Sequence, residues 1–299
     1  MTVAIIGYAS IDHAVRTAEA PIADRTVRIT SRPADGWGRA GGSPAYVCRA
    51  LVAEGVAAPR AISWVGDDAA GEAYRLGLTA DGVDTFGIAA IAGARTPLSI
   101  LAYADSGGCA CLYDPGMPPQ GLTEAQADLV AASDWLVVTV GPTRALQEAL
   151  ERVRPDTQVA WLVKADPEAF TPGLQKRLAA RATLITHSAA EWEFVEEALA
   201  HPSSQSERLV VETRGAEGLA WWQTQMGRVL AEGHRPAKPH PVQDQSGAGD
   251  TLAAGVLAGL IEGSSADQAI DRGVAAVDRF LEQRAMRERA SDRDTGTTE

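Results

Sequence analysis

The sequence predicts an α/β protein with a doubly wound, mostly parallel sheet and a small additional β-sheet. Along most of the chain, short apolar segments of buried-strand type alternate with stretches of helical period, as in a parallel sheet covered by helices on both faces. Two segments, residues 11–40 and 96–113, have neither the length nor the period of helices. They interrupt the alternation and predict paired antiparallel strands.

The core elements follow one another in a regular order. The predicted strands are short and apolar, and they span residues 3–7, 61–65, 135–140, 159–163, 183–186 and 209–213. The predicted helices show the 3.6-residue period, and they span residues 44–54, 69–81, 123–132, 143–152, 172–181 and 189–200. After the last strand we expect a hairpin over 219–230 and two helices, over 251–262 and 265–289.

The two irregular segments predict a flap. In the second of them, TPLSILAYADSGGCACLY reads as strand, turn and strand, with the turn at residues 106–108. A flap near the start of a parallel sheet would stand over the carboxyl ends of the strands, where doubly wound folds bind ligands. Residues 1–290 are therefore interpreted as one α/β domain that carries this flap, and the polar segment 291–299 as a disordered tail.

Composition and charge exclude several classes of protein. The 299 residues include 27 Lys and Arg against 39 Asp and Glu, a net charge of −12, with 45% hydrophobic residues. This is a globular composition, and without basic runs we expect no nucleic-acid partner. No apolar run reaches the ~20 residues of a membrane helix, and the first residues lack a signal peptide, so the cytoplasm is the expected location. Three cysteines do not make a disulfide framework.

The most informative segment is DQSGAGDTLAAGVLAGL, residues 244–260. A loop of small residues that includes Gly247, Ala248 and Gly249 leads directly into an apolar helix. Glycines let backbone amides point at one place, and a helix N-terminus favours an anion, so this loop is a candidate anion hole for a phosphoryl group. Asp250 beside it is a candidate general base for a substrate hydroxyl, although an Asp in this position can equally be a helix N-cap.

This segment resembles the D-T-x-G-A-G-D signature of the ribokinase-like, or PfkB, carbohydrate kinase family. Asp244 and residues 247–250 match, while Gln245 stands where Thr is usual. Further landmarks of the family occur in order from residue 3 to about 282. The resemblance implies a ribokinase-like fold and an ATP-dependent kinase that phosphorylates a hydroxyl group, for instance a hydroxymethyl group, of a sugar or nucleoside. It implies that Asp250 is the general base, that the amides of the loop stabilise the transferring phosphoryl group, and that Asp244 contributes to nucleotide binding.

Two motifs resemble the acceptor-binding residues of the family. The segment GYASIDHAV resembles the opening strand and its acidic residue, which makes Asp12 a ligand for substrate hydroxyls; read alone, Asp12 could be a turn residue. The segment AGGSPAYVCRAL resembles the G-G-x-x-x-N substrate loop, with Gly41 and Gly42 as its glycines. Tyr46 stands where the family has Asn, and such a side chain could stack on a nucleobase or narrow a sugar pocket.

Two further motifs resemble the nucleotide side. THSAAEWEF is similar to the N-x-x-E motif, in which Glu191 would help to hold magnesium through water, while Ser188 replaces the Asn. Without the family, Glu191 is an ordinary residue of a first helical turn. VVETRGAEGLA is similar to T-x-G-x-x-G, so that Thr213 and Gly215 would contact the phosphates and Gly218 would begin the hairpin.

The resemblance implies ATP and magnesium as cofactors, allows a monovalent cation, and suggests a homodimer formed through the flap. A non-catalytic binding protein of the same fold is the alternative, because Tyr46, Ser188 and Gln245 depart from the family pattern. A dehydrogenase would need G-x-G-x-x-G after the first strand, and the sequence has none there. The motifs do not distinguish a sugar from a nucleoside as the acceptor.

Overall fold

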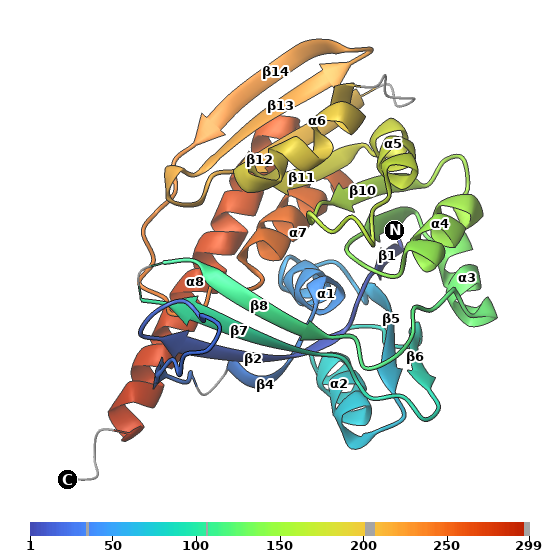
Figure 1. The fold of residues 1–299 in the computed structure, drawn as a ribbon. Helices are drawn as coiled ribbons and strands as arrows, with labels where there is room; N and C mark the ends of the chain where they lie inside the picture. The colour runs from blue at the N-terminus through green and yellow to red at the C-terminus, as the bar shows by residue number, and fades with distance from the viewer. Residues whose placement is uncertain (34–35, 106, 201–206, 296–299) are drawn as a thin grey trace.

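A nine-stranded sheet forms the centre of the molecule (Figure 1). The computed structural model describes residues 1–33, 36–105, 107–200 and 207–295. In spatial order the strands of the sheet are β14 (Arg228–Arg235), β13 (Leu219–Gln225), β12 (Glu207–Thr213), β11 (Leu184–Ser188), β10 (Gln158–Leu162), β9 (Trp135–Val138), β1 (Val3–Ile6), β5 (Arg60–Gly66) and β6 (Ile88–Ile91).

Seven of these strands run parallel, and only the hairpin β13–β14 runs antiparallel. The central strands are apolar on both faces because helices cover both sides; every residue of β1 and β9 is buried. The carboxyl ends of parallel strands meet at one edge of a sheet, so the residues that follow β1, β10, β11 and β12 are brought together. This confirms the predicted fold class, although the sequence analysis missed the short edge strand β6.

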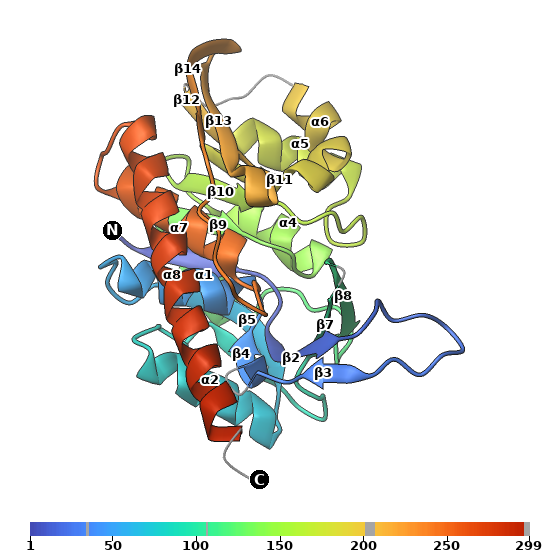
Figure 2. The ribbon, with the colours of Figure 1, turned by 90° about the vertical axis from the view of Figure 1, so that its left-hand side faces the viewer.

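Two groups of helices cover the sheet (Figures 1 and 2). One hydrophobic cluster joins the sheet to helices α1 (Ser43–Ala53), α2 (Ala69–Ala80), α7 (Ala248–Ile261) and α8 (Ala266–Thr295). The opposite cluster joins it to α3 (Glu124–Ala131), α4 (Thr143–Arg152), α5 (Pro172–Arg181) and α6 (Trp192–Ala200). No helix in the described ranges is both long and apolar enough to span a membrane.

A separate five-stranded sheet contains the two irregular segments. Its strands are β2 (Ser10–Thr17), β3 (Ile29–Ser31), β4 (Trp37–Gly41), β7 (Leu98–Ala104) and β8 (Cys109–Asp114). Strand β2 lies at its centre and pairs with β3, β4 and β7. The predicted paired strands are therefore present; residue 106 of the predicted turn lies outside the described residues.

The boundaries of three helices differ from the prediction. Helix α7 begins at Ala248, so part of the predicted glycine loop is the first helical turn. The segment predicted as a helix over 189–200 begins with one turn of 3₁₀-helix, η2 (Ala189–Glu191), before α6. Helix α8 continues to Thr295, which corrects the predicted disordered tail for residues 291–295, because no Gly or Pro interrupts a helix that is already packed on α7. Residues 296–299 of that tail lie outside the described residues.

Candidate functional site

Asp12 lies where the chain passes from the large sheet into the small one. Strand β1 ends at Ile6, and β2 begins four residues later and carries Asp12, which is only 3% exposed. In the small sheet Asp12 lies between Arg39 of β4 and Ser99 of β7. Burial raises the pKa of the Asp12 carboxyl, although hydrogen bonds from Tyr46 and Ser10 oppose this effect.

The predicted Gly-Gly loop packs directly against Asp12. A Cβ atom on Gly41 would lie 2.1 Å from the Asp12 carboxylate, so a larger residue would displace it. Gly42 is the N-cap of α1 with a positive φ of 80°, and a Cβ there would lie 2.2 Å from the Tyr8 carbonyl oxygen. The pair of glycines is therefore required for close packing of α1 and β2, a role that the sequence analysis did not foresee.

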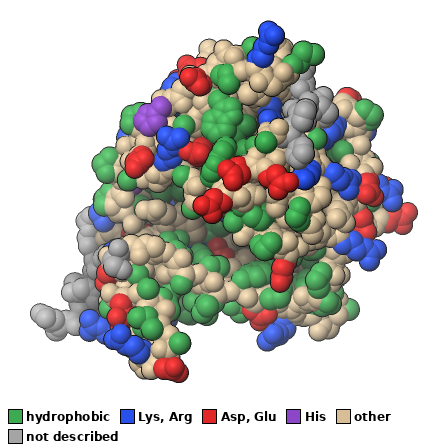
Figure 3. Space-filling model, turned by 45° about the horizontal axis from the view of Figure 1, so that its top comes forward, with side chains coloured by type: hydrophobic (Ala, Val, Ile, Leu, Met, Phe, Trp, Pro, Cys, Tyr) green, Lys and Arg blue, Asp and Glu red, His purple; other side chains and the backbone are tan. Residues whose placement is uncertain are grey.

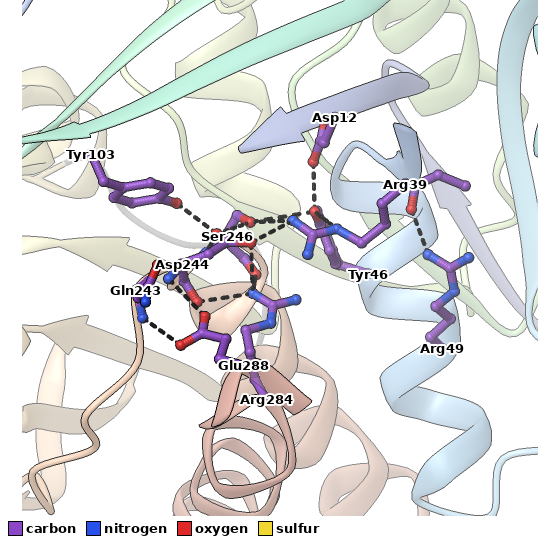
Figure 4. Close-up of polar contacts among 11 residues, drawn as sticks. Asp12, Arg39, Tyr46, Arg49, Tyr103, Gln243, Asp244, Ser246, Arg284 and Glu288 are labelled. Atoms are coloured by element: carbon purple, nitrogen blue, oxygen red, sulfur yellow. Dashed lines mark hydrogen bonds and ion pairs between the residues drawn. The ribbon is translucent and has the colours of Figure 1, made fainter. Parts of the chain in front are cut away.

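Tyr46 and Arg39 complete the surroundings of Asp12 (Figure 4). The Tyr46 hydroxyl donates to Asp12 Oδ2 at 2.5 Å and accepts from Arg39 Nε at 3.1 Å. The guanidinium carbon of Arg39 lies 5.5 Å from the centre of the Tyr46 ring. Tyr46 and Arg39 are largely buried, so water screens these contacts only weakly. The positive charge of Arg39 lowers the electrostatic cost of burying the Asp12 carboxylate.

Asp244 connects the signature segment to the small sheet and to α8. Asp244 is 1% exposed, and its Oδ2 pairs with Arg39 at 2.8 Å and with Arg284 at 3.4 Å. Its Oδ1 accepts from the Tyr103 hydroxyl at 2.9 Å and from the backbone and hydroxyl of Ser246. Burial opposes ionisation of Asp244, but the two arginines and the Ser246 hydrogen bonds hold its pKa below the ordinary value.

Gly247 and Asp250 define the start of α7. Gly247 is the N-cap in the left-handed conformation, with φ 84°, and a Cβ on it would lie 2.5 Å from the ring of Tyr46. Because Gly247 is the cap, Asp250 lies in the first helical turn and no side-chain capping hydrogen bond is present. The alternative that Asp250 is simply an N-cap is therefore wrong. The amides of Ala248 and Gly249 lie in this same turn, where the helix dipole favours negative charge.

The Asp250 carboxyl lies among charges from three other segments. Burial raises its pKa. Lys164 and a hydrogen bond with Ser43 at the start of α1 lower the pKa, whereas the negative charges of Asp12 and Glu191 raise it. The negative charges of Asp12, in the small sheet, and of Glu191, which follows β11, therefore act on the Asp250 carboxyl. Lys164 is exposed just beyond β10 and makes no ion pair with a described residue.

Ser188 and Glu191 form a local capping box at the end of β11. The backbone amide and the hydroxyl of Ser188 donate to Glu191 Oε2 at 2.7 and 2.9 Å. No described residue donates to Glu191 Oε1. Within the described ranges no group of three His, Cys, Asp or Glu side chains could hold a metal ion by itself. Magnesium commonly binds one or two carboxylates together with substrate phosphates and water, so the free oxygen of Glu191 fits a water-mediated role.

The segment after β12 forms an exposed turn beside this capping box. Thr213 lies opposite Ser188 in the parallel register, so the two predicted nucleotide motifs are neighbours at one edge of the sheet. Gly215 begins the 3₁₀-turn η3 (Gly215–Glu217) with φ 57°, in open space. Gly218 ends that turn with φ 93°, and a Cβ on it would lie 2.0 Å from the Arg235 carbonyl oxygen. Gly215 and Gly218 therefore allow the backbone to form this turn, and the open space at Gly215 leaves room for a ligand.

These segments surround a hollow in the molecular surface. Figure 3 shows it between the part of the large sheet that ends in β13–β14 and the small sheet, with Asp and Glu side chains along its border. Among the predicted residues, Asp12 and Tyr46 contact each other, and Gly247 lies against Tyr46. Arg39, Tyr103, Lys164 and Arg284 were not predicted from the sequence as site residues, and they reach the site from separate elements.

The comparisons with known proteins agree with this arrangement. The model of the pfkB family of carbohydrate kinases matches residues 2–280. The chain belongs to this family. No match was found among curated proteins.

Solved structures of the family share the fold at low identity. A ribokinase from Cryptococcus neoformans var. grubii in complex with ADP has a TM-score of 0.72 at 19% identity, with 93% of each chain covered. A ribokinase from Arabidopsis thaliana complexed with ribose and ATP has a TM-score of 0.70 at 18% identity, covering 92% of this chain and 91% of that one. A nucleoside kinase from Methanocaldococcus jannaschii has a TM-score of 0.71 at 16% identity, covering 93% and 90%. These structures show the fold, and the family match identifies the chain as a member of the pfkB carbohydrate kinases.

Proposed function

We propose that this pfkB family protein is an ATP-dependent kinase that phosphorylates a hydroxyl group of a sugar. The observation that carries the proposal is the position of Asp250. It lies in the N-terminal turn of α7 without serving as its cap, and the charges of Lys164, Asp12 and Glu191 act on its carboxyl group. The solved relatives with bound ADP, or with bound ribose and ATP, support the use of a nucleotide.

In the proposed reaction Asp250 accepts the proton of the acceptor hydroxyl. The acceptor oxygen forms a bond to the γ-phosphorus, and the bond from that phosphorus to the bridging oxygen of ADP breaks. The backbone amide of Gly249, in the first turn of α7, stabilises the charge on the transferring group, while the amide of Ala248 donates to the Gln245 carbonyl oxygen and shapes the loop. Asp12, held by Tyr46 and beside Gly41 and Gly42, orients the acceptor.

We assign Lys164 and the two nucleotide motifs to the binding of the phosphate groups of ATP. The ammonium group of Lys164 offsets charge that develops on the phosphates, in a protein whose net charge is −12. Thr213 and Gly215 contact the phosphates. Magnesium, when bound, neutralises phosphate charge, and Glu191 with Ser188 would hold its water shell. The charge of Asp244 is already neutralised by Arg39 and Arg284, so we assign Asp244 a positioning role. For the same reason we propose no monovalent-cation site in this loop.

The surroundings of Tyr46 favour a sugar over a nucleoside. Stacking on a nucleobase requires a free ring face, yet Tyr46 is only 7% exposed. Gly247 lies against its ring, and the Arg39 guanidinium lies over it. Of the two roles open to this side chain, narrowing the acceptor pocket fits the structure better than base stacking.

The test is a measurement of ADP release with ATP and magnesium over a panel of sugars and nucleosides. We expect turnover with a sugar, and a loss of kcat of at least ~10²-fold in Asp250→Asn with nearly unchanged nucleotide affinity. Asp267→Asn, an exposed ion-pair residue of α8, is the matched control and should keep full activity. Turnover retained in Asp250→Asn would refute the base role. Nucleotide binding without transfer to any acceptor would instead favour the non-catalytic alternative.

A further inference from the structure

A second cavity lies between α1 and α8. It is a cleft of about 540 Å³, within the size range of small-molecule sites. Arg39 and Tyr46 belong to its wall, and Asp12 and Asp250 do not. Figure 4 shows Arg49 of α1 and Arg284 of α8 on either side of Arg39 and Tyr46. The cleft therefore shares a wall with the proposed acceptor site but is separate from it.

The lining of this cleft is strongly basic, although the protein as a whole is acidic. Its five basic side chains are Arg39, Arg49, Arg279, Arg284 and Arg287, and its two acidic ones are Glu54 and Asp81. The two carboxylates are already committed: Asp81 pairs with Arg49, and Glu54 pairs with Arg279 and with Arg272 from outside the cleft. Asp244, which lies outside the lining, pairs with Arg39 and Arg284. The five guanidinium groups therefore have three carboxylate partners, and a smaller excess of positive charge is left.

Two features of the cleft select the kind of anion. Arg287 is exposed at its border, and no described side chain forms an ion pair with it. Guanidinium groups on two facing helices suit a group with several anionic oxygens, such as a phosphate, because each can donate two parallel hydrogen bonds. Apolar side chains, among them Val52, Ala53 and Phe280, line the same space and would cover the carbon skeleton of a small molecule.

We propose that this cleft binds a small organic phosphate and that the bound molecule acts on the acceptor site through Arg39. Arg39 donates to Asp244 and to the Tyr46 hydroxyl, and Tyr46 in turn holds Asp12. An anion in the cleft competes with Asp244 for Arg39 and Arg284. Occupancy therefore weakens the contacts that fix Asp12 and raises the KM for the acceptor.

Calorimetric titration with ribose 5-phosphate, fructose 6-phosphate and inorganic phosphate tests the site without ATP, so the result does not depend on the kinase proposal. We expect at least one ester to bind more tightly than inorganic phosphate. Arg287→Glu should weaken it about ten-fold or more, because it replaces an attractive charge by a repulsive one. Arg144→Glu makes the same change on exposed α4, on the opposite side of the large sheet, and should leave binding unchanged.

Three results would overturn the proposal. If no ester binds, or if Arg287→Glu and Arg144→Glu bind it equally well, the cleft is not the site. If inorganic phosphate binds as tightly as the esters, the cleft does not recognise the organic part. The coupling is tested separately through the acceptor KM at saturating ester: an increase in the wild type that is lost in Arg287→Glu supports it, and an unchanged KM in the wild type refutes it.

Discussion

The hydroxyl group of Tyr46 donates a 2.5 Å hydrogen bond to the carboxylate of Asp12. This contact joins helix α1 to strand β2 of the small sheet, and both partners are buried. It gives a structural reason why Tyr can stand where the family usually has Asn. A longer side chain reaches the acidic residue directly and fixes its orientation.

Tyr46→Phe should therefore act on acceptor binding. The substitution leaves the buried Asp12 carboxylate without its tyrosine donor, and a lost hydrogen bond to a charged group costs roughly 1.5–3 kcal/mol. We expect the KM for the acceptor to rise about ten-fold or more, with little change in kcat, because neither group touches the reacting atoms. Steady-state kinetics with varied acceptor measures this, and an unchanged KM would show that Asp12 does not orient the acceptor.

The raised pKa of Asp250 sets the acid limit of activity. A general base must be ionised, and burial raises its pKa above the ordinary value of 3.8. The rate should therefore fall with decreasing pH at a pH above 3.8, in a step that requires one proton. A profile of kcat/KM against pH checks this, and an acid limb at or below 3.8 contradicts it.

Asp250→Asn should raise stability while it removes activity. A carboxyl group whose pKa is higher in the folded state than in the unfolded state makes the folded state less stable above that pKa, so the ionised Asp250 is destabilising at neutral pH. We expect the Tm of the variant to be higher than that of the wild type at pH 7, with the difference vanishing in acid. A lower Tm at pH 7 would indicate a structural role for the carboxylate.

Asp244→Ala should destabilise the protein strongly. It leaves Arg39 and Arg284, with side chains 13% and 7% exposed, without their shared counter-ion. Breaking a buried ion pair from one side costs about 3–5 kcal/mol in the free energy of unfolding. Asp156→Ala breaks an ion pair whose Asp side chain is 78% exposed, and should cost less than about 1 kcal/mol. Denaturant titration of both variants gives the comparison, and equal costs would refute the role of Asp244.

Two cysteines offer a probe of the acceptor site. Cys109 and Cys111 lie two residues apart on β8 and so share one face of the strand. Burial raises the pKa of Cys109 to about 11, and a hydrogen bond with Tyr103 opposes this shift. Burial also raises the pKa of Cys111, and the negative charge of Asp12 adds to the effect. Alkylation should thus be slow at pH 7 and accelerate as the pH rises towards 11, because the thiolate reacts.

The acceptor should protect these thiols, whereas the buried Cys48 should not react in the folded protein. Mass spectrometry after timed iodoacetamide treatment, with and without acceptor, measures the protection. The Cys109→Ser, Cys111→Ser double variant should keep its activity and resist inactivation. Labelling that is unaffected by a saturating acceptor would place the acceptor away from this face of β8.

Most of the fold could be predicted from the sequence alone, because the helices and strands are marked by the local spacing of apolar residues. The apolar runs at β1, β9 and β10 and the 3.6-residue spacing of the helices depend only on neighbouring residues. The edge strand β6 is only four residues long and includes two alanines, which favour strands weakly, although Ile88, Ala89 and Ile91 all pack against the core. Helix α8 extends beyond its apolar part because nothing in the sequence interrupts it. The homodimer through the small sheet stays a prediction.

The sequence by itself determined the family, the glycine-rich start of α7 and the candidate base Asp250, because these are carried by residues adjacent in the chain. Only the tertiary structure brought Arg39 of the small sheet, Asp244 of the signature segment and Arg284 of α8 into one ion-pair network. Only it showed that Gly41 and Gly247 are needed to accommodate Asp12 and Tyr46. Contacts between distant segments depend on how sheets and helices pack, and no local pattern encodes them.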